Sequence, residues 1–190
     1  MNLDEIATAI KQSSTQHKLT LIAVEGYGGS GKSTLAEKLK KHLPNAEVVK
    51  IDAFILKEPA QNAEPWELVF DRKRLERQVL EPASQGHTIS FQVLDWAKNI
   101  LGQTITLPKT EYLIIDGISS YHPDIEHYYK YKLWVDTPID VAKHRGQLRD
   151  RDNENAVLWD KWARCDLEYQ SKYHPEKRAD FVVSNNRDKK

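Results

Sequence analysis

The sequence predicts an α/β fold in which helices flank a parallel β-sheet, and three observations support this prediction. Short apolar runs with the length of buried strands alternate with longer segments that have helical spacing. A glycine-rich loop joins one of these strands to the helix that follows it. Two acids, Asp52 and Asp116, stand just after or at the carboxyl ends of strands, where sheets of this kind bind ligands.

The first quarter of the chain is predicted to contain a helix, a strand, a second helix and a second strand. Residues 1–16 are mixed polar, with isoleucines at helical spacing, and predict a short amphipathic helix. The apolar run 19–24 predicts a buried strand, and 32–42 predicts a helix with its apolar residues on one face. The run 47–51 predicts the next strand.

The middle of the chain is predicted to form one helix and a pair of short strands. The polar, proline-bounded segment 57–64 predicts a loop, and 65–86 predicts a helix that opens on a proline. The apolar positions of this helix are Leu68, Val69, Leu75, Val79 and Leu80. Residues 88–93 and 104–107 predict two short strands, with 94–99 in the connection between them.

The last third of the chain returns to alternating strands and helices. The runs 112–117 and 131–136 predict core strands, and the second is followed by Thr137-Pro138, which is typical of a helix start. The last helix is predicted over roughly 155–173, and 181–183 predicts a short final strand. We find no internal repeat and no domain linker in the sequence.

Length and composition predict one domain over residues 1–190 and narrow the classes of function. Lys plus Arg equals Asp plus Glu at 28 each, and this balance gives no support for a nucleic-acid-binding surface. The single cysteine, Cys165, excludes a disulfide within the chain and a thiolate zinc site. The apolar runs are too short to span a membrane and the N-terminus does not resemble a signal peptide, so a cytoplasmic enzyme is expected.

The segment between the strand 19–24 and the helix 32–42 matches the phosphate-binding P-loop pattern G-x-x-x-x-G-K-[ST]. Its residues are Gly26, Tyr27, Gly28, Gly29, Ser30, Gly31, Lys32, Ser33 and Thr34. The glycines allow backbone N–H groups to turn toward an anion, and the helix N-terminus adds partial positive charge. Lys32 is positioned to reach the β- and γ-phosphates, and the Ser33 hydroxyl to bind Mg²⁺. The loop predicts binding of a nucleoside triphosphate with Mg²⁺.

Two acids extend this prediction toward catalysis. The apolar strand that ends in Asp116 places a carboxylate beside the P-loop, where it can hold Mg²⁺ directly or through water. Asp52 lies at the same edge and suits the carboxylate that a kinase needs near its acceptor hydroxyl. The alternative for Asp52 is a capping or turn aspartate without a chemical role.

Arginines and tryptophans supply the remaining candidates. Arg145 and Arg149 are four residues apart on one predicted helix face, and together they suit a clamp on the transferring phosphoryl group. The alternative is a solvated charged face. Among the tryptophans, Trp96 is the candidate for contact with the acceptor. Trp134, Trp159 and Trp162 are interpreted as core packing.

Five stretches of the chain, in the same order, resemble the uridine kinase family. That family lies within the P-loop nucleoside kinases, a group that also holds phosphoribulokinases, bacterial pantothenate kinases and nicotinamide riboside kinases. The stretches are 26–34, 52–54, 66–67 with 75–82, 115–117 and 145–150. The ending 179–183 also resembles the last strand of the family, so the likeness spans about 19–185.

The resemblance implies a three-layer P-loop fold with a five-stranded parallel sheet and a helical lid at about 145–158. It implies ATP and Mg²⁺ as donor and cofactor, with Asp52 facing the acceptor hydroxyl. It further implies that Arg145 and Arg149 are lid arginines that act with Lys32 on the phosphates. The residues that it suggests for acceptor binding are Asp52, Asp71, Phe91, Asp95 and Trp96.

The chain departs from the pattern of uridine kinases around the acceptor. Ala53 and Ile55 replace residues that are usually polar or aromatic, and Phe91 stands where the family has a tyrosine. A nucleoside-like acceptor is therefore the first expectation, with pantothenate, nicotinamide riboside and sugars left open. A sugar phosphate would need further cations, for which Lys57 and 72–74 are candidates. A P-loop ATPase without an acceptor and a homo-oligomeric state also stay open.

Overall fold

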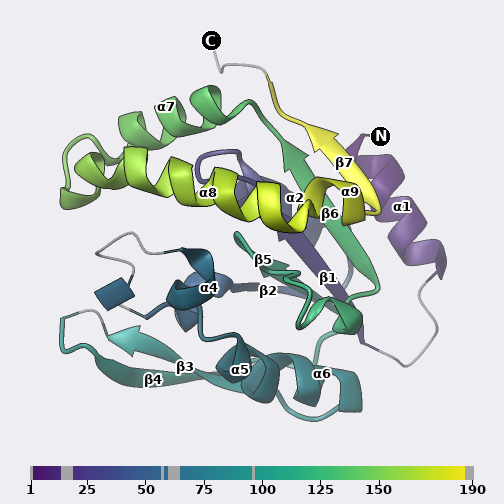
Figure 1. Ribbon diagram of the computed structural model, residues 1–190. Coiled ribbons are helices and arrows are strands. Elements are labelled where there is room, and N and C mark those ends of the chain that lie inside the picture. The colour runs from purple at the N-terminus through teal and green to yellow at the C-terminus, as the bar shows by residue number, and fades with distance from the viewer. Residues whose placement is uncertain (1, 14–18, 57, 60–64, 96, 187–190) are drawn as a thin grey trace.

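A computed structural model describes residues 2–13, 19–56, 58–59, 65–95 and 97–186. It shows an α/β fold whose main sheet has five parallel strands in the order β2-β5-β1-β6-β7 (Figure 1). The strands are β1 (Thr20–Glu25), β2 (Ala46–Lys50), β5 (Tyr112–Asp116), β6 (Tyr131–Asp136) and β7 (Phe181–Ser184). The predicted α/β class and the five-stranded parallel sheet are confirmed.

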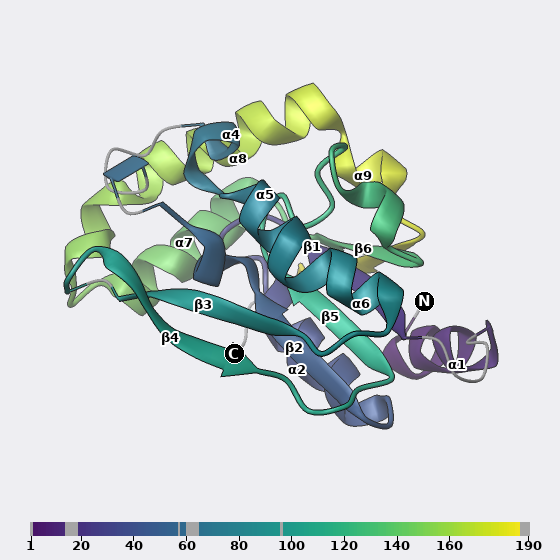
Figure 2. The ribbon, with the colours of Figure 1, turned by 90° about the horizontal axis from the view of Figure 1, so that it is seen from below.

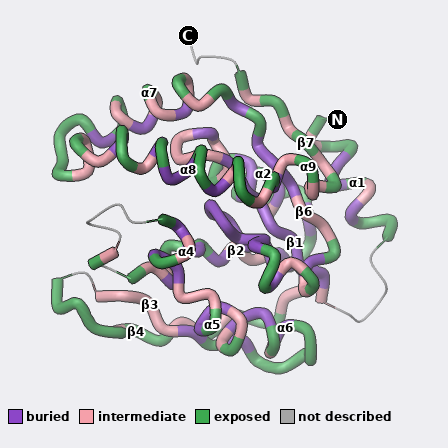
Figure 3. The backbone as a smooth tube through the Cα atoms, in the orientation of Figure 1, coloured by how far each residue is buried: buried purple, intermediate pink, exposed green. Residues whose placement is uncertain are grey.

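The central strands are apolar because both of their faces are covered. Every residue of β1 and of β5 is buried (Figure 3), as expected for inner strands of a parallel sheet. Their pairing places Leu21 opposite Leu113 and Val24 opposite Asp116, so β5 ends level with the start of the P-loop. The edge strands β2 and β7 are only partly buried.

Helices cover both faces of the sheet and form the outer layers. The helices are α1 (Leu3–Ser13), α2 (Lys32–His42), α4 (Trp66–Val69), α5 (Arg72–Leu75), α6 (Glu81–Gln85), α7 (Ile139–Asp150), α8 (Trp159–Tyr173) and α9 (Pro175–Arg178). Apolar residues of α1 and α2 form one core with alternate residues of β1 and β5. Residues of α5, α6 and α8 form a second core with the other residues of these strands. Helices α7 and α8 run side by side above the sheet (Figure 1).

A two-stranded antiparallel hairpin stands apart from the main sheet, beside α5 and α6 (Figure 2). Its strands are β3 (Ser90–Asp95), which is shifted by two residues from the prediction, and β4 (Ile100–Thr106), which starts earlier than predicted. Both extend further toward the turn, because Leu94 pairs with Leu101 and Asp95 with Ile100. The predicted connection at 94–99 is therefore a tighter turn. Most of β4 is exposed (Figure 3).

The predicted single helix over 65–86 is wrong in its first half. Helix α4 ends at Val69, Phe70 forms an antiparallel bridge with Ile55, and a new helix starts after Asp71. Leu68, expected on the apolar face, is 59% exposed. From Arg72 the chain stays helical until Gly86 caps the end of α6. The helix passes through a π-helical turn, η2 (Glu76–Leu80), which precedes Pro82, a residue without an amide hydrogen.

Three short 3₁₀ turns complete the described elements: η1 (Ile51–Phe54), η3 (Glu126–Tyr128) and η4 (Glu154–Leu158). The last long helix therefore begins at Trp159 rather than near 155. The loop predicted at 57–64 falls largely outside the described residues. In the part of the chain that is described, no helix is both long and apolar enough to cross a membrane.

Candidate active site

The glycine-rich loop connects β1 to α2 and is packed closely by other elements. Gly29 and Gly31 have φ of 78° and 97°, in the left-handed region that favours glycine. A side chain at Gly29 would collide with the carbonyl oxygen of Ala142 in α7, and one at Gly31 with the amide of Asn185 after β7. The loop therefore has a fixed shape, set by the surrounding backbone as well as by its own sequence.

The P-loop residues do not all face the same way. Gly28, Gly29, Lys32 and Ser33 line a cavity of about 660 Å³, whereas Thr34 is exposed on α2 outside its described lining. The Lys32 ammonium donates to the Tyr27 carbonyl oxygen at 3.3 Å. The Tyr27 ring packs edge-on against Trp134, with 5.4 Å between ring centroids. The remaining loop residues, Gly26, Ser30 and Gly31, shape the backbone behind the cavity.

Asp116 and Ser33 provide oxygen atoms at one place in the cavity. Asp116 ends β5, is 3% exposed, and its Oδ1 has no hydrogen-bond partner among the described residues. Burial raises the pKa of Asp116, while the charge of Lys32 and a hydrogen bond from Ser33 act in the opposite direction. Mg²⁺ is held in proteins by one or two such oxygen ligands together with phosphate oxygens. The pair therefore fits the predicted magnesium site.

Asp52 lines the cavity from the turn η1, which follows β2 at the same edge of the sheet as Asp116. Burial is the main reason that the pKa of Asp116 is raised, and the hydrogen bond to Asp150 is the main reason that the pKa of Arg149 is raised. The nearby charge of Asp52 is a smaller cause that raises both pKa values. The turn is held from below by Arg74, which donates to the carbonyl oxygen of Ala53 at 2.9 Å. Arg74 is 3% exposed, so this support belongs to the core.

The two arginines of α7 are separated by the structure. Arg149 lines the cavity, lies over the Trp159 ring at 5.4 Å, and donates two 2.9 Å hydrogen bonds to Asp150. These bonds are the main reason that the pKa of Arg149 is raised. Arg145 is not among the described lining residues and donates to the carbonyl oxygen of Asn185 at 3.0 Å. Arg145 thus faces the outer side of the P-loop.

Of the residues expected to bind the acceptor, Asp52 lines the cavity, whereas Asp71, Phe91 and Asp95 lie elsewhere. Asp71 caps α5 by accepting from the Arg74 amide, and Phe91 is 4% exposed in the core against Phe54. Asp95 accepts from two backbone amides in the hairpin turn. None of these three is among the described lining residues, and Trp96 lies outside the described part of the chain. Their side chains are used for local structure.

An aromatic wall takes the place of the expected acceptor residues. Trp66 and Phe70 from the α4 region and Trp159 and Trp162 from α8 all line the cavity. Core packing, the interpretation from sequence, holds for both tryptophans of α8, since Trp159 is 3% exposed and Trp162 packs against the core. Both also line the cavity. Trp134 is buried as expected.

Asp166 is the acid that sequence reasoning missed. It is 2% exposed on α8, and its two oxygens accept from the Gly28 amide at 2.7 Å and the Trp66 indole at 2.8 Å. Its spacing from Trp159 and Trp162, i, i+3 and i+7, was the available signal, since these positions share a helix face.

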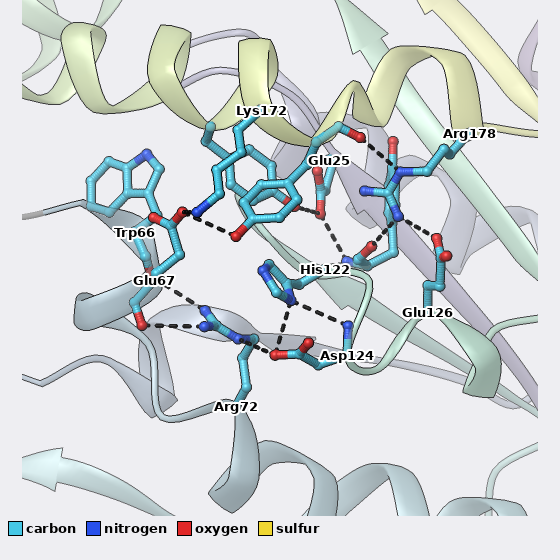
Figure 4. A network of polar contacts seen from close by, with 12 residues as sticks. Glu25, Trp66, Glu67, Arg72, His122, Asp124, Glu126, Lys172 and Arg178 are labelled. Atoms are coloured by element: carbon cyan, nitrogen blue, oxygen red, sulfur yellow. Dashed lines mark hydrogen bonds and ion pairs between the residues drawn. The ribbon is translucent and has the colours of Figure 1, made fainter.

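A polar network fixes the α4 wall to α8 (Figure 4). Glu67 accepts from the Lys172 ammonium at 2.9 Å and from the Tyr173 hydroxyl at 3.1 Å. Arg72 donates to the Glu67 carbonyl oxygen at 3.2 Å and lies 3.6 Å from the carboxylate of Asp124. The segment that carries Trp66 is thus tied to α8 through Glu67 and to Asp124 through Arg72.

Comparison with known proteins finds relatives in sequence and in fold. No family model matches the chain. A uridine kinase of Macrococcus caseolyticus (strain JCSC5402) is 26% identical over 152 residues, which cover 74% of this chain and 73% of that protein. A candidate fructose transport system kinase from Silicibacter sp. TM1040 superposes with a TM-score of 0.76 and 21% identity, covering 96% and 98% of the two chains. A candidate uridine kinase from Bacillus stearothermophilus gives 0.73 and 18%, covering 95% and 96%.

Proposed function

We propose that this chain, which belongs to the uridine kinase-like P-loop kinases, phosphorylates a hydroxyl group of a ring-bearing small molecule of the nucleoside type that carries no negative charge. One observation carries the proposal. A single cavity joins Lys32, Ser33 and Asp116 to Asp52 and to a wall of aromatic rings. The cavity therefore has one surface that suits a phosphate donor and another that suits a flat acceptor.

The donor side of the cavity suits the triphosphate of ATP. Backbone amides of the P-loop and the Lys32 ammonium are placed to hold the phosphates. Ser33 and Asp116 are the residues that would hold Mg²⁺, which neutralises phosphate charge when bound. Arg149 is the arginine we assign to the transferring group, and the segment 145–158 is the proposed lid. Arg145, beside Asn185, is proposed to support the loop from behind.

The charges of the cavity disfavour an anionic acceptor. Of the described lining residues two are cationic, Lys32 and Arg149, and both serve the phosphates. The other charged lining residues are the acids Asp52, Asp116, Glu154 and Asp166. A sugar phosphate or a carboxylate such as pantothenate would meet these acids without a cation left to pair with it.

The aromatic wall favours a flat ring in the acceptor. Trp66, Phe70 and Trp162 offer apolar faces on the side of Asp52 and Asp166. The indole N–H of Trp162 is buried and has no hydrogen-bond partner in the part of the chain that is described.

Asp52 is the proposed base. It would orient the acceptor hydroxyl and take its proton as the hydroxyl oxygen forms a bond to the γ-phosphorus. The bond between that phosphorus and the β–γ bridging oxygen breaks, and ADP leaves. This chemistry depends on position and charge, and the fixed η1 turn supplies the position.

The test is a panel of acceptors with ATP and Mg²⁺, followed by ADP release and mass spectrometry of the products. The panel contains uridine, cytidine, nicotinamide riboside, fructose, pantothenate and a sugar phosphate. We expect one of the nucleosides to gain a single phosphate and the anionic compounds to react at least about tenfold more slowly. Phosphorylation of pantothenate or a sugar phosphate would refute the acceptor class. ADP release that no acceptor changes would indicate an ATPase.

A further inference from the structure

Asp166 is a buried carboxylate that contacts both sides of the cavity. Its Oδ2 accepts from the amide of Gly28 in the P-loop at 2.7 Å. Its Oδ1 accepts from the indole N–H of Trp66 in the aromatic wall at 2.8 Å. These partners lie 138 and 100 residues away in the sequence, and neither is on α8. A single side chain therefore joins the donor loop to the acceptor wall.

The chemistry of the two bonds requires an aspartate at this position. A buried carboxylate is costly unless both oxygens are hydrogen-bonded, and here each oxygen has an N–H donor. Burial raises the pKa of Asp166, while the Gly28 bond, the charge of Lys32 and the Trp66 bond favour its charged form. Asparagine has one acceptor oxygen, so it would satisfy one of the two donors and face the other with its own N–H₂ group.

The Trp66 ring is buried in apolar packing, and the bond to Asp166 is the hydrogen bond that its indole N–H makes among the described residues. Helix α4 has only four residues, and Trp66 is its first. The ring of Phe70 packs beside it, with 5.6 Å between centroids, and gives no directional bond. The Glu67–Lys172 pair holds the α4 backbone to α8 but does not touch the indole. The bond to Asp166 is therefore the directional contact that sets how Trp66 faces the acceptor.

The Gly28 amide belongs to the loop where the phosphates of the donor are proposed to bind. An anion that enters this loop competes with the Asp166 carboxylate for the amide and also repels its charge. Because the same carboxylate holds the Trp66 indole, a change at Gly28 reaches the acceptor wall through one residue. This gives a physical route between the two substrates.

We propose that Asp166 is a positioning residue that couples nucleotide binding at the P-loop to the orientation of Trp66 in the acceptor wall. The inference rests on the proposed function in one respect, that the P-loop binds nucleotide. It adds a residue and a coupling that the kinase chemistry itself does not require.

NMR of the full chain, labelled with ¹⁵N, tests the coupling without any acceptor. Trp66→Phe assigns the Trp66 indole resonance, which is then followed during a titration with Mg²⁺–ADP. We expect the resonance to move in the wild type and its shift to fall by about fivefold or more in Asp166→Asn. The affinity for Mg²⁺–ADP should stay within about threefold. Glu67→Gln is the matched control, because it weakens the other α4–α8 link, and its Trp66 response should be kept.

Spectra without nucleotide decide the structural half of the proposal. Asp166→Asn should move the Gly28 amide and the Trp66 indole resonances together. Trp66→Phe, which removes the indole N–H and keeps a smaller aromatic ring, should move the Gly28 amide. An equal ADP-induced shift of Trp66 in wild type and Asp166→Asn, or no shift in the wild type, would overturn the coupling. If Mg²⁺–ADP does not bind to the protein, the proposed function fails. If the Gly28 and Trp66 resonances of Asp166→Asn have the same positions as in wild type, this inference alone is refuted.

Discussion

Glu25 leads to a prediction about pH that can be worked out from the structure. It is the last residue of β1, directly before the P-loop, and it is 0% exposed. Its Oε1 accepts from the Tyr121 amide at 2.8 Å and the Tyr169 hydroxyl at 3.2 Å. Its Oε2 has no partner among the described residues. Burial raises the pKa of Glu25 from 4.5 to about 8, and the Tyr121 bond and the charges of Arg178 and Lys32 offset this only in part.

The sign of the effect follows from the raised pKa. Below pH 4.5 the carboxyl group is protonated in both the folded and the unfolded chain. Between pH 4.5 and about 8 the unfolded chain loses this proton and the folded chain keeps it, so the free energy of unfolding falls as the pH rises. At ~1.4 kcal/mol per pH unit, the interval from 4.5 to about 8 corresponds to a loss of at most roughly 5 kcal/mol. Glu25→Gln removes the titration and hence this loss.

Urea unfolding of wild type and Glu25→Gln at pH 5, 6, 7 and 8 measures the prediction. We expect the stability of Glu25→Gln relative to wild type to increase steadily over this range. Glu37→Gln, on the exposed side of α2, controls for the removal of one carboxylate. Parallel profiles for wild type and Glu25→Gln would refute the reasoning, because they would mean that Glu25 titrates alike in the folded and unfolded chain.

Three further substitutions test the cavity. Lys32→Ala should lower turnover by about 10²–10⁴-fold with little loss of stability, since the Lys32 ammonium donates one 3.3 Å hydrogen bond to a loop carbonyl oxygen, and unchanged turnover would contradict the site assignment. Arg149→Gln should lower kcat by about tenfold or more and leave the affinity for ADP within about threefold; a large loss of ADP binding instead would place Arg149 in donor binding. Gly146→Ala should destabilise the fold by about 1–3 kcal/mol in urea unfolding, because its new methyl group meets the Trp159 ring, and an unchanged midpoint would show that the ring moves freely.

Local patterns predicted the part of the site that is local in sequence. The P-loop lies in one short segment between a buried strand and a helix, and Asp116 ends a fully buried strand. Asp52 follows β2 directly, so the parallel sheet itself carries it to the same edge as Asp116. In each case strand direction and burial determine the position, and both can be read from the sequence.

The acceptor wall could not be predicted in the same way. Asp166 contacts residues 100 and 138 positions away, and no local pattern specifies such a pair. Phe91 was assigned to the site by its place in a motif, but it packs on Phe54 in the core. Trp159 and Trp162 share an apolar helix face, which fits a core and a cavity wall equally well. Tertiary packing alone separates these alternatives.

The most direct test of the central claim compares phosphoryl transfer by wild type, Asp52→Asn and Asp95→Asn with one nucleoside acceptor, measured by mass spectrometry. Asp52 lines the cavity beside the P-loop, whereas Asp95 accepts from backbone amides in the hairpin turn. The account predicts that Asp52→Asn loses about 10²–10⁴-fold in product formation and that Asp95→Asn stays within about threefold of wild type. Equal product formation by Asp52→Asn and wild type would contradict it.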